Sequence, residues 1–247
     1  MSVRTILRSA AIWGGMAGVV MAAFPPMMLG YPLVLVDPDR ALSDWYFRTI
    51  GKAIVRANPL WRVEVVGKEK LERGGPFVLV VNHQSFADLV AMCFLDHPTK
   101  YLGKASVFRV PVLGWGMTIA GQVPVVRGDR ESGKEAVGKL AGWLRRGVSV
   151  ALFPEGTRSE SGAIGGFRLG AFRLAIAEGR PVVPVVLSGA RELLPKRSVL
   201  FEKHAVIRLQ VLDAIATAGR PADGAQALAD EVRARMVAAF AAAEPRG

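Results

Sequence analysis

The sequence predicts an α/β fold, a mostly parallel β-sheet sandwiched by helices, preceded by an N-terminal helical, membrane-associated segment. Over most of the chain, short Val-rich runs alternate with amphipathic stretches, which is the pattern of strands joined by crossover helices. Two of these runs, 77–81 and 148–152, are continuously apolar, as expected for buried parallel strands. Near the N-terminus, by contrast, charge almost disappears. We therefore expect a two-helix segment over residues 1–57 and one larger domain over residues 58–247.

The first 36 residues carry Arg4 and Arg8 and then no charge from Ser9 through Val36. About 20 apolar helical residues cross a bilayer, so this run is long enough to span one. Prolines at 25, 26 and 32 interrupt it, which leaves a kinked span or a helix that enters one leaflet and turns back. The two arginines favour a cytoplasmic N-terminus. A cleaved signal peptide is the alternative interpretation.

Residues 37–57 predict a second, amphipathic helix. One face is apolar and aromatic, and another carries the basic stripe Arg48, Lys52 and Arg56, with Trp45 near the boundary between them. A basic stripe beside an aromatic face is typical of a helix that lies among lipid headgroups. An ordinary amphipathic helix docked on the domain is the alternative. The Asn58-Pro59 pair ends the helix and marks the expected domain boundary.

The following domain alternates between the two kinds of element. We expect an edge strand at 61–66, further strands at 77–81, 100–104, 122–126, 148–153, 182–187 and 204–212, and helices at 87–95, 112–120, 131–146, 167–178 and 221–244. Pro124 and Pro184 fall inside predicted strands, which indicates sheet edges or irregular stretches.

The charge balance narrows the possible partners. Lys and Arg number 32 against 21 acidic residues, for a net charge of +11, which suits nucleic acid, an anionic membrane surface or acidic substrates. No nucleic-acid-binding motif is present, so we expect a membrane surface and no nucleic acid. The single cysteine, Cys93, lies in an apolar run and predicts a core thiol. No Cys/His cluster has the spacing of a metal site, so we expect no metal.

The most informative stretch is NHQSFAD at 82–88. His83 directly follows a predicted buried strand, and Asp88 opens the next helix. In open α/β sheets, ligands bind at the carboxyl ends of the strands. A turn of this length brings the carboxylate of Asp88 back to the imidazole, where it would keep one ring nitrogen protonated and leave the other as a base.

A second motif, FPEGTR at 153–158, follows the strand at 148–152 in the same way, so the two loops are expected to face each other. Arg158 offers a planar donor fork for phosphate or carboxylate. Gly156 permits close backbone approach, and Glu155 would orient a basic side chain or a substrate hydroxyl. Two further basic residues, Lys104 and Arg127, also follow strand ends. Together these residues predict an anion pocket beside a base, which suits transfer onto an alcohol of a phosphorylated substrate.

These motifs resemble those of the glycerolipid (PlsC-type) acyltransferases. The 82–88 stretch resembles their NHx4D block, and 153–158 resembles their FPEGTR block in the same order and spacing. Weaker similarities link 104–127 to the second block and 183–185 to the fourth. The resemblance implies a bacterial-type 1-acyl-sn-glycerol-3-phosphate O-acyltransferase, which moves an acyl chain from acyl-CoA or acyl carrier protein to the sn-2 hydroxyl of lysophosphatidate.

The resemblance also implies the role of each residue. His83 would be the base and Asp88 its partner, and the substrate-binding residues would be Lys104, Arg127, Glu155, Gly156, Thr157 and Arg158. It implies no cofactor, since the thioester is a co-substrate, and a place at the cell inner membrane with the catalytic domain facing the cytoplasm. Two alternatives stay open: acylation of another lysolipid such as lyso-ornithine lipid, and a non-catalytic membrane-binding protein. A binding protein has no need of a base–carboxylate pair.

Overall fold

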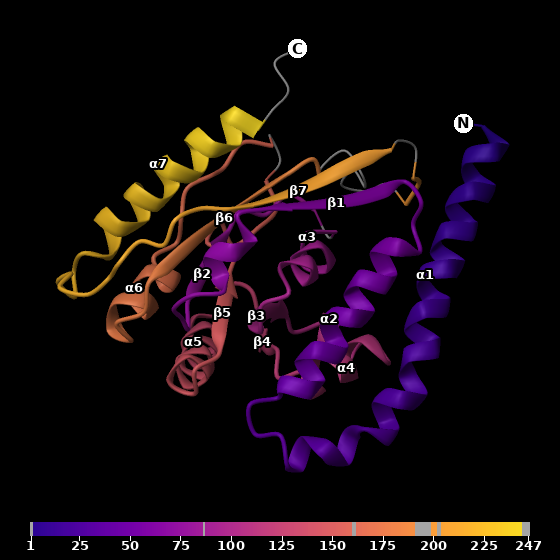
Figure 1. Ribbon diagram of the computed structural model, residues 1–247, viewed down its shortest axis with the longest axis horizontal. Helices are drawn as coiled ribbons and strands as arrows, with labels where there is room; N and C mark the ends of the chain where they lie inside the picture. The colour runs from indigo at the N-terminus through magenta and orange to yellow at the C-terminus, as the bar shows by residue number, and fades with distance from the viewer. Residues whose placement is uncertain (1, 86, 160–161, 191–198, 202–203, 244–247) are drawn as a thin grey trace.

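The computed structural model describes residues 2–85, 87–159, 162–190, 199–201 and 204–243. Within them, seven strands form one sheet in the order β1-β7-β6-β2-β5-β3-β4 (Figure 1). Neighbouring strands pair in parallel, except that β6 and β7 are antiparallel. The strands are β1 (Trp61–Val66), β2 (Val78–Val81), β3 (Thr99–Lys104), β4 (Val123–Val125), β5 (Ser149–Leu152), β6 (Val182–Ser188) and β7 (Ala205–Val211). The predicted fold class is confirmed, and β1 lies at an edge as predicted.

Helices cover both faces of the sheet (Figure 1). One face carries α5 (Arg130–Arg145), α6 (Gly170–Ala177) and α7 (Ala225–Ala243), and the other carries α2 (Ala41–Arg56), α3 (Ala87–Ala91) and α4 (Leu113–Ile119). Short 3-10 turns are η1 (Tyr31–Leu35), η2 (Lys68–Leu71), η3 (Met92–Leu95) and η4 (Val107–Arg109). The helix predicted over 87–95 is thus split into α3 and η3, and α6 begins three residues after the predicted start.

The central strand β2 shows why these residues form a buried parallel strand. Its side chains are fully buried on both faces of the sheet. Val78 and Val80 point into the core under α5, α6 and α7, whereas Leu79 and Val81 belong to the core on the opposite side. A strand between two helical layers has no polar face, so its sequence is apolar without alternation. The end of β2 is therefore fixed from both sides, which positions the residues that follow.

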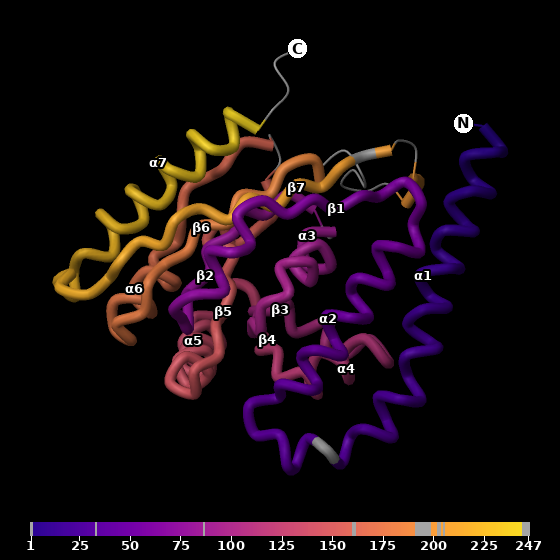
Figure 2. The backbone as a smooth tube through the Cα atoms, in the orientation of Figure 1, coloured from indigo at the N-terminus to yellow at the C-terminus, as the bar shows by residue number. Residues whose placement is uncertain are grey.

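The N-terminal segment begins with one continuous helix, α1 (Val3–Leu29), which contains Pro25 and Pro26 in its last turns. The chain then passes through η1 and reverses into α2 (Figure 2). The reversal therefore follows Pro25 and Pro26 and includes Pro32, which lies in η1. Among the described residues, α1 is the helix that is long and apolar enough to cross a membrane by length and composition.

The N-terminal half of α1 packs against the domain. The indole Nε1 of Trp13 donates to the carbonyl oxygen of Val199 over 2.8 Å, and the Ser9 hydroxyl accepts from the amide of Phe201 over 2.9 Å. Ile12 and Met16 are buried in the same core as β2 and β6. This half of α1 is thus part of the folded unit.

Two of the three cations in the basic stripe predicted on α2, Arg48 and Lys52, pair with acidic side chains of the protein. Arg48 is only 9% exposed, and its Nε donates to Asp44 over 2.8 Å. Lys52 pairs with Asp96, which belongs to the domain. Among the uncharged side chains of α2, Leu42 and Trp45 are 49% and 55% exposed, whereas Phe47 and Ile50 are half-buried. Arg48 and Lys52 therefore fit the docked alternative, because Asp44 on α2 itself and Asp96 on the domain neutralise them, whereas Arg56 is exposed.

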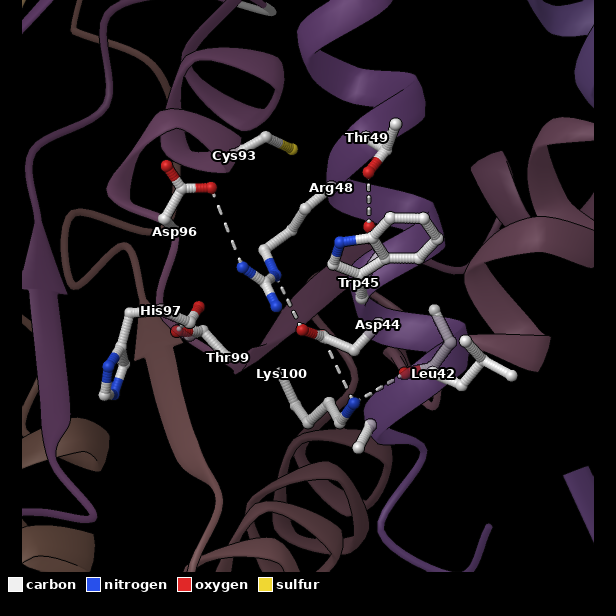
Figure 3. A network of polar contacts seen from close by, with 12 residues as sticks. Leu42, Asp44, Trp45, Arg48, Thr49, Cys93, Asp96, His97, Thr99 and Lys100 are labelled. Carbon is white, nitrogen blue, oxygen red and sulfur yellow. Dashed lines mark hydrogen bonds and ion pairs between the residues drawn. The ribbon is translucent and has the colours of Figure 1, made fainter. Parts of the chain in front are cut away.

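A buried ion network fastens α2 to the sheet (Figure 3). Lys100, on β3, is completely buried, and its ammonium donates to Asp44 over 3.2 Å and to the carbonyl oxygen of Ala120 over 2.9 Å. Burial lowers the pKa of Lys100, although the carboxylate of Asp44 opposes that shift. The network links α2, β3 and the end of α4.

Two further expectations concern single residues. Pro184 does not lie at an edge, because β6 pairs with β2 and β7 on its two sides. The strand is nevertheless irregular next to Pro184, as predicted. Residues 185–188 of β6 pair with β7 in one register, whereas the bridge between Val182 and Ile215 is shifted from that register by one residue. Cys93 is a buried core thiol, as predicted, and burial raises its pKa to about 12.

Candidate active site

His83 and Asp88 form a hydrogen-bonded pair at the end of β2. Nδ1 of His83 lies 2.7 Å from Oδ2 of Asp88. The same oxygen accepts the amides of Gln84 and Ser85, over 2.7 and 2.9 Å. Upstream, the side-chain amide of Asn82 exchanges two hydrogen bonds with the backbone of Leu187 on β6. The segment therefore wraps around the carboxylate while its first residue is fastened to the sheet.

This arrangement determines what the imidazole can do. Asp88 is fully buried and His83 is 7% exposed. An ionised carboxylate only accepts hydrogen bonds, so Nδ1 of His83 carries the proton and Nε2 is left with its lone pair. Among the described residues, Nε2 makes no hydrogen bond. The pair can thus act as a base at Nε2, with Asp88 stabilising the imidazolium that forms.

The two predicted loops do face each other, because β2 and β5 are neighbours. Glu155 accepts the amide of His83 on Oε1 over 2.9 Å and the amide of Gly165 on Oε2 over 3.0 Å. The amide of Ser159 donates to the carbonyl oxygen of His83 over 2.8 Å, and the rings of His83 and Phe153 lie 4.4 Å apart. Glu155 was expected to orient a basic side chain or a substrate hydroxyl. Instead, both of its oxygens hold backbone.

A cavity of about 440 Å³ opens in front of His83. Of the predicted residues, it is lined by His83, Lys104, Arg127, Gly156 and Arg158. Asp88, Glu155 and Thr157 are not in its wall: the first two lie behind His83, as described above, and Thr157 is exposed. The structure thus brings three predicted cations to one cavity with the predicted base.

Sequence reasoning missed a fourth cation in this wall, Arg168. The amide of Arg168 donates to the carbonyl oxygen of Pro154 over 2.9 Å. Gly156 has a φ of 72°, and a Cβ there would lie 2.6 Å from Nε of Arg168. Arg168 reaches the cavity because the loop after the FPEGTR turn folds back onto that turn. In the sequence, only the glycines at 162, 165 and 166 indicate that the loop can fold back in this way.

A second, apolar cavity of about 100 Å³ adjoins the first. Residues of α1, α2, α3, β3 and α4 line it, among them Val20, Phe47, Ile50 and Met117. Leu89, Leu102, Gly103 and Val107 line both cavities. A cationic chamber and an apolar chamber therefore share a wall beside His83, which suits a ligand with a charged head and a hydrocarbon tail.

The described residues contain no group of three or more His, Cys, Asp or Glu side chains that could hold a metal ion. The expectation of a site without metal or cofactor stays a prediction.

The comparisons with known proteins agree on the family. The acyltransferase family model matches residues 62–188. The chain is 33% identical over 214 residues to the chloroplastic 1-acyl-sn-glycerol-3-phosphate acyltransferase LPAT1 of Arabidopsis thaliana, covering 85% of this chain and 58% of that protein. It is 37% identical over 174 residues to the 1-acyl-sn-glycerol-3-phosphate acyltransferase of Chlamydomonas reinhardtii, covering 70% of this chain and 52% of that one. The chain thus spans between half and two thirds of the length of these relatives.

A solved structure shares the fold. The crystal structure of the 1-acyl-sn-glycerophosphate acyltransferase PlsC from Thermotoga maritima superposes with a TM-score of 0.80 at 23% identity, covering 99% of this chain and 98% of that one. The family match includes both β2 with its His83–Asp88 pair and β5 with the 153–158 turn. The chain belongs to the acyltransferase family.

Proposed function

We propose that the chain is a 1-acyl-sn-glycerol-3-phosphate acyltransferase, which moves a fatty acyl group from a thioester to the sn-2 hydroxyl of lysophosphatidate and so makes phosphatidate. One observation carries the proposal: the His83–Asp88 pair opens on a cavity whose wall holds four cations and adjoins an apolar chamber. Lysophosphatidate combines the same features, a phosphate, a hydroxyl and a hydrocarbon chain. Relatives that match most of this chain carry the name of this activity.

In the proposed reaction, Nε2 of His83 takes the proton of the sn-2 hydroxyl while the hydroxyl oxygen attacks the thioester carbonyl carbon. The tetrahedral intermediate then collapses, the carbon–sulfur bond breaks, and the proton passes from His83 to the departing sulfur. The products are phosphatidate and a free thiol. Asp88 keeps Nδ1 protonated and stabilises the positive charge that His83 carries between the two proton transfers. Acyl-CoA and acyl carrier protein both supply such a thioester, and no cofactor takes part.

We assign the acceptor phosphate to the cations of the larger cavity. Arg158 and Arg168 present planar forks that suit a phosphate, and Lys104 and Arg127 add positive charge to the same wall. Gly156 lets the backbone turn beside them. Glu155 supports the base from behind, and we give Thr157 no direct contact. The apolar chamber would take hydrocarbon, since its wall is almost entirely apolar.

We also propose that residues 1–57 attach the catalytic domain, residues 58–247, to an anionic membrane surface, in the cell at the inner membrane with the domain facing the cytoplasm. The supporting observation is the exposed apolar surface around the α1–α2 turn. Leu29, Leu35 and Val36 are 83%, 87% and 78% accessible, far more than such side chains usually are. Changing Leu35 and Val36 to Glu should release the protein from anionic vesicles in a flotation assay; unchanged flotation would place the attachment elsewhere.

The activity is tested by incubating the purified protein with lysophosphatidate and either acyl-CoA or acyl carrier protein, and detecting phosphatidate by mass spectrometry. We expect phosphatidate from the wild type and none above background from His83→Ala. Parallel incubations with lyso-ornithine lipid and lysophosphatidylcholine test the acceptor. Product from one of these and none from lysophosphatidate would show that the acceptor is that other lysolipid. No product from any lysolipid, with vesicle binding retained, would favour the non-catalytic alternative.

A further inference from the structure

We propose that Arg233, on the C-terminal helix α7, is a positioning residue for the His83 base and acts through a chain of hydrogen bonds that ends on the backbone of His83. The inference rests on the proposed function, because it assigns Arg233 a share in the same reaction. Arg233 lies beyond residues 62–188, the region that the family model matches, and is not part of either sequence motif.

The first link joins α7 to the loop that follows the FPEGTR turn. Nε of Arg233 donates to the carbonyl oxygen of Gly165 over 2.7 Å, and Nη2 donates to the carbonyl oxygen of Ile164 over 3.0 Å. The planar fork of a guanidinium fits two adjacent carbonyl groups, which a lysine could not engage in the same way. Within the described part of the chain, no carboxylate pairs with Arg233, so its charge is directed at this loop.

The second link runs through a single peptide group, the one that joins Ile164 and Gly165. Its carbonyl accepts from Arg233, and its N–H donates to Oε2 of Glu155 over 3.0 Å. A hydrogen bond at one end of a peptide group polarises it and strengthens the bond at the other end. A Cβ on Gly165 would lie 3.2 Å from Oε2 of Glu155, so the glycine allows the two to approach closely.

The third link reaches the base itself. Oε1 of Glu155 accepts the amide of His83 over 2.9 Å. The same loop holds this motif at two more points: Ser159 donates its amide to the carbonyl oxygen of His83, and Gln84 donates its side-chain amide to the carbonyl oxygen of Gly162 over 3.1 Å. The loop thus holds the backbone of residues 83–84 through several hydrogen bonds, and Arg233 in turn fixes the position of the loop. A shift of about 1 Å in such a group can cost about 100-fold in rate.

The experiment compares Arg233→Gln and Arg233→Lys with a matched control, Arg235→Gln. Arg235 lies on the same helix, is exposed, and pairs only locally with Glu231 over 2.7 Å. We expect Arg233→Gln to lower kcat about tenfold with KM for lysophosphatidate within about twofold, because it displaces the base and not the phosphate site. The lysine variant should recover less than half of that loss. Arg235→Gln should match the wild type.

A second background decides whether the effect runs through Glu155. In Glu155→Gln, where the carboxylate link is already weakened, Arg233→Gln should cost less than about twofold. The same factor in both backgrounds would overturn the proposed route. Amide hydrogen exchange provides a readout without activity: exchange at 162–166 should be faster in Arg233→Gln than in Arg235→Gln.

The two proposals fail in different ways. A wild type that makes no phosphatidate refutes the function, and the exchange comparison then still tests the role of Arg233. If the wild type is active, but the Arg233→Gln and Arg235→Gln variants have equal kcat and equal hydrogen exchange at 162–166, the role of Arg233 is refuted and the proposed function is not. Circular dichroism confirms that each variant is folded, and Arg233→Lys serves for the kinetic comparison if the glutamine variant is not.

Discussion

Two buried carboxylates in this fold are stabilised by different means. Asp88 accepts hydrogen bonds from the His83 ring and from two backbone amides, and among the described residues no arginine or lysine pairs with it. Asp44 is also almost completely buried, but two basic side chains, Arg48 and Lys100, surround it. Both are close to fully desolvated, with exposures of 0% and 1%.

The difference separates a reactive group from a structural one. The partner of Asp88 is an imidazole, which can accept a proton from a substrate and pass it on, so the charge of the pair can change during a reaction. Asp44 and Lys100, the structural pair, instead hold α2 against β3 and the end of α4. Substitutions in the first region should therefore affect turnover, and substitutions in the second should affect stability.

The largest effect is expected at the reactive pair. Asp88→Asn keeps the shape of the side chain and an acceptor for the two amides, but removes the charge that stabilises protonated His83. We expect kcat to fall on the order of 10²–10⁴-fold, which is the usual contribution of a positioned base. The thermal midpoint should change little. Steady-state kinetics and a melting curve measure both, and a variant that lost stability but kept its turnover would reverse the assignment.

The next largest effect is expected at Asp44. Asp44→Leu leaves Lys100 and Arg48 buried without a carboxylate between them, and removing one partner of a buried pair costs about 3–5 kcal/mol. Urea unfolding measures this loss. Lys100→Met should cost less, because Asp44 keeps Arg48, and adding it to Asp44→Leu should restore part of the loss. Specific activity of the folded fraction should stay near that of the wild type; a loss of turnover as large as that of Asp88→Asn would abolish the distinction.

A smaller effect is expected at Arg168. This cation belongs to the region around His83, whereas Lys100 belongs to the region around Asp44. Lys100 is neutralised by Asp44, whereas among the described residues no carboxylate pairs with Arg168, which lines the larger cavity. Arg168→Gln should raise KM for lysophosphatidate about tenfold and leave kcat nearly unchanged, because it removes one charge-assisted contact made equally in the ground and transition states. Initial rates over a range of acceptor concentrations would detect it. An unchanged KM would remove Arg168 from the phosphate site.

The smallest effect concerns a second imidazole, His97, which lies near the structural pair. Burial, with Arg48 nearby, lowers the pKa of His97 below its ordinary 6.5, despite the opposing charge of Asp44. The unfolded chain therefore binds a proton at a pH where the folded chain does not, and stability should fall as pH drops below 6.5. Urea midpoints between pH 7 and 5 test this. His97→Gln should have a flatter profile than the wild type; equal slopes would assign the acid sensitivity to other groups.

The reactive pair could be predicted from the sequence, and the structural pair could not. His83 and Asp88 lie in one short stretch directly after a strand, so local spacing already brings them together. Asp44 and Lys100 are joined only when α2 docks on β3, and no local pattern encodes that contact. The same holds for Arg168, which needs the chain to fold back beside Gly156. The docking of Lys52 was missed for the same reason, because its acidic partner Asp96 lies on a distant segment.

The contacts of Trp13 and Ser9 with residues 199–201 limit how this protein can meet a bilayer. These contacts hold the first half of α1 against the body of the domain, on the same side as the remainder of the fold. A helix that crossed a bilayer would carry its first half to the opposite surface and break them. With these contacts intact, α1 would therefore meet the bilayer from the side on which the domain lies, and the exposed turn between α1 and α2 would be the part free to enter the near leaflet.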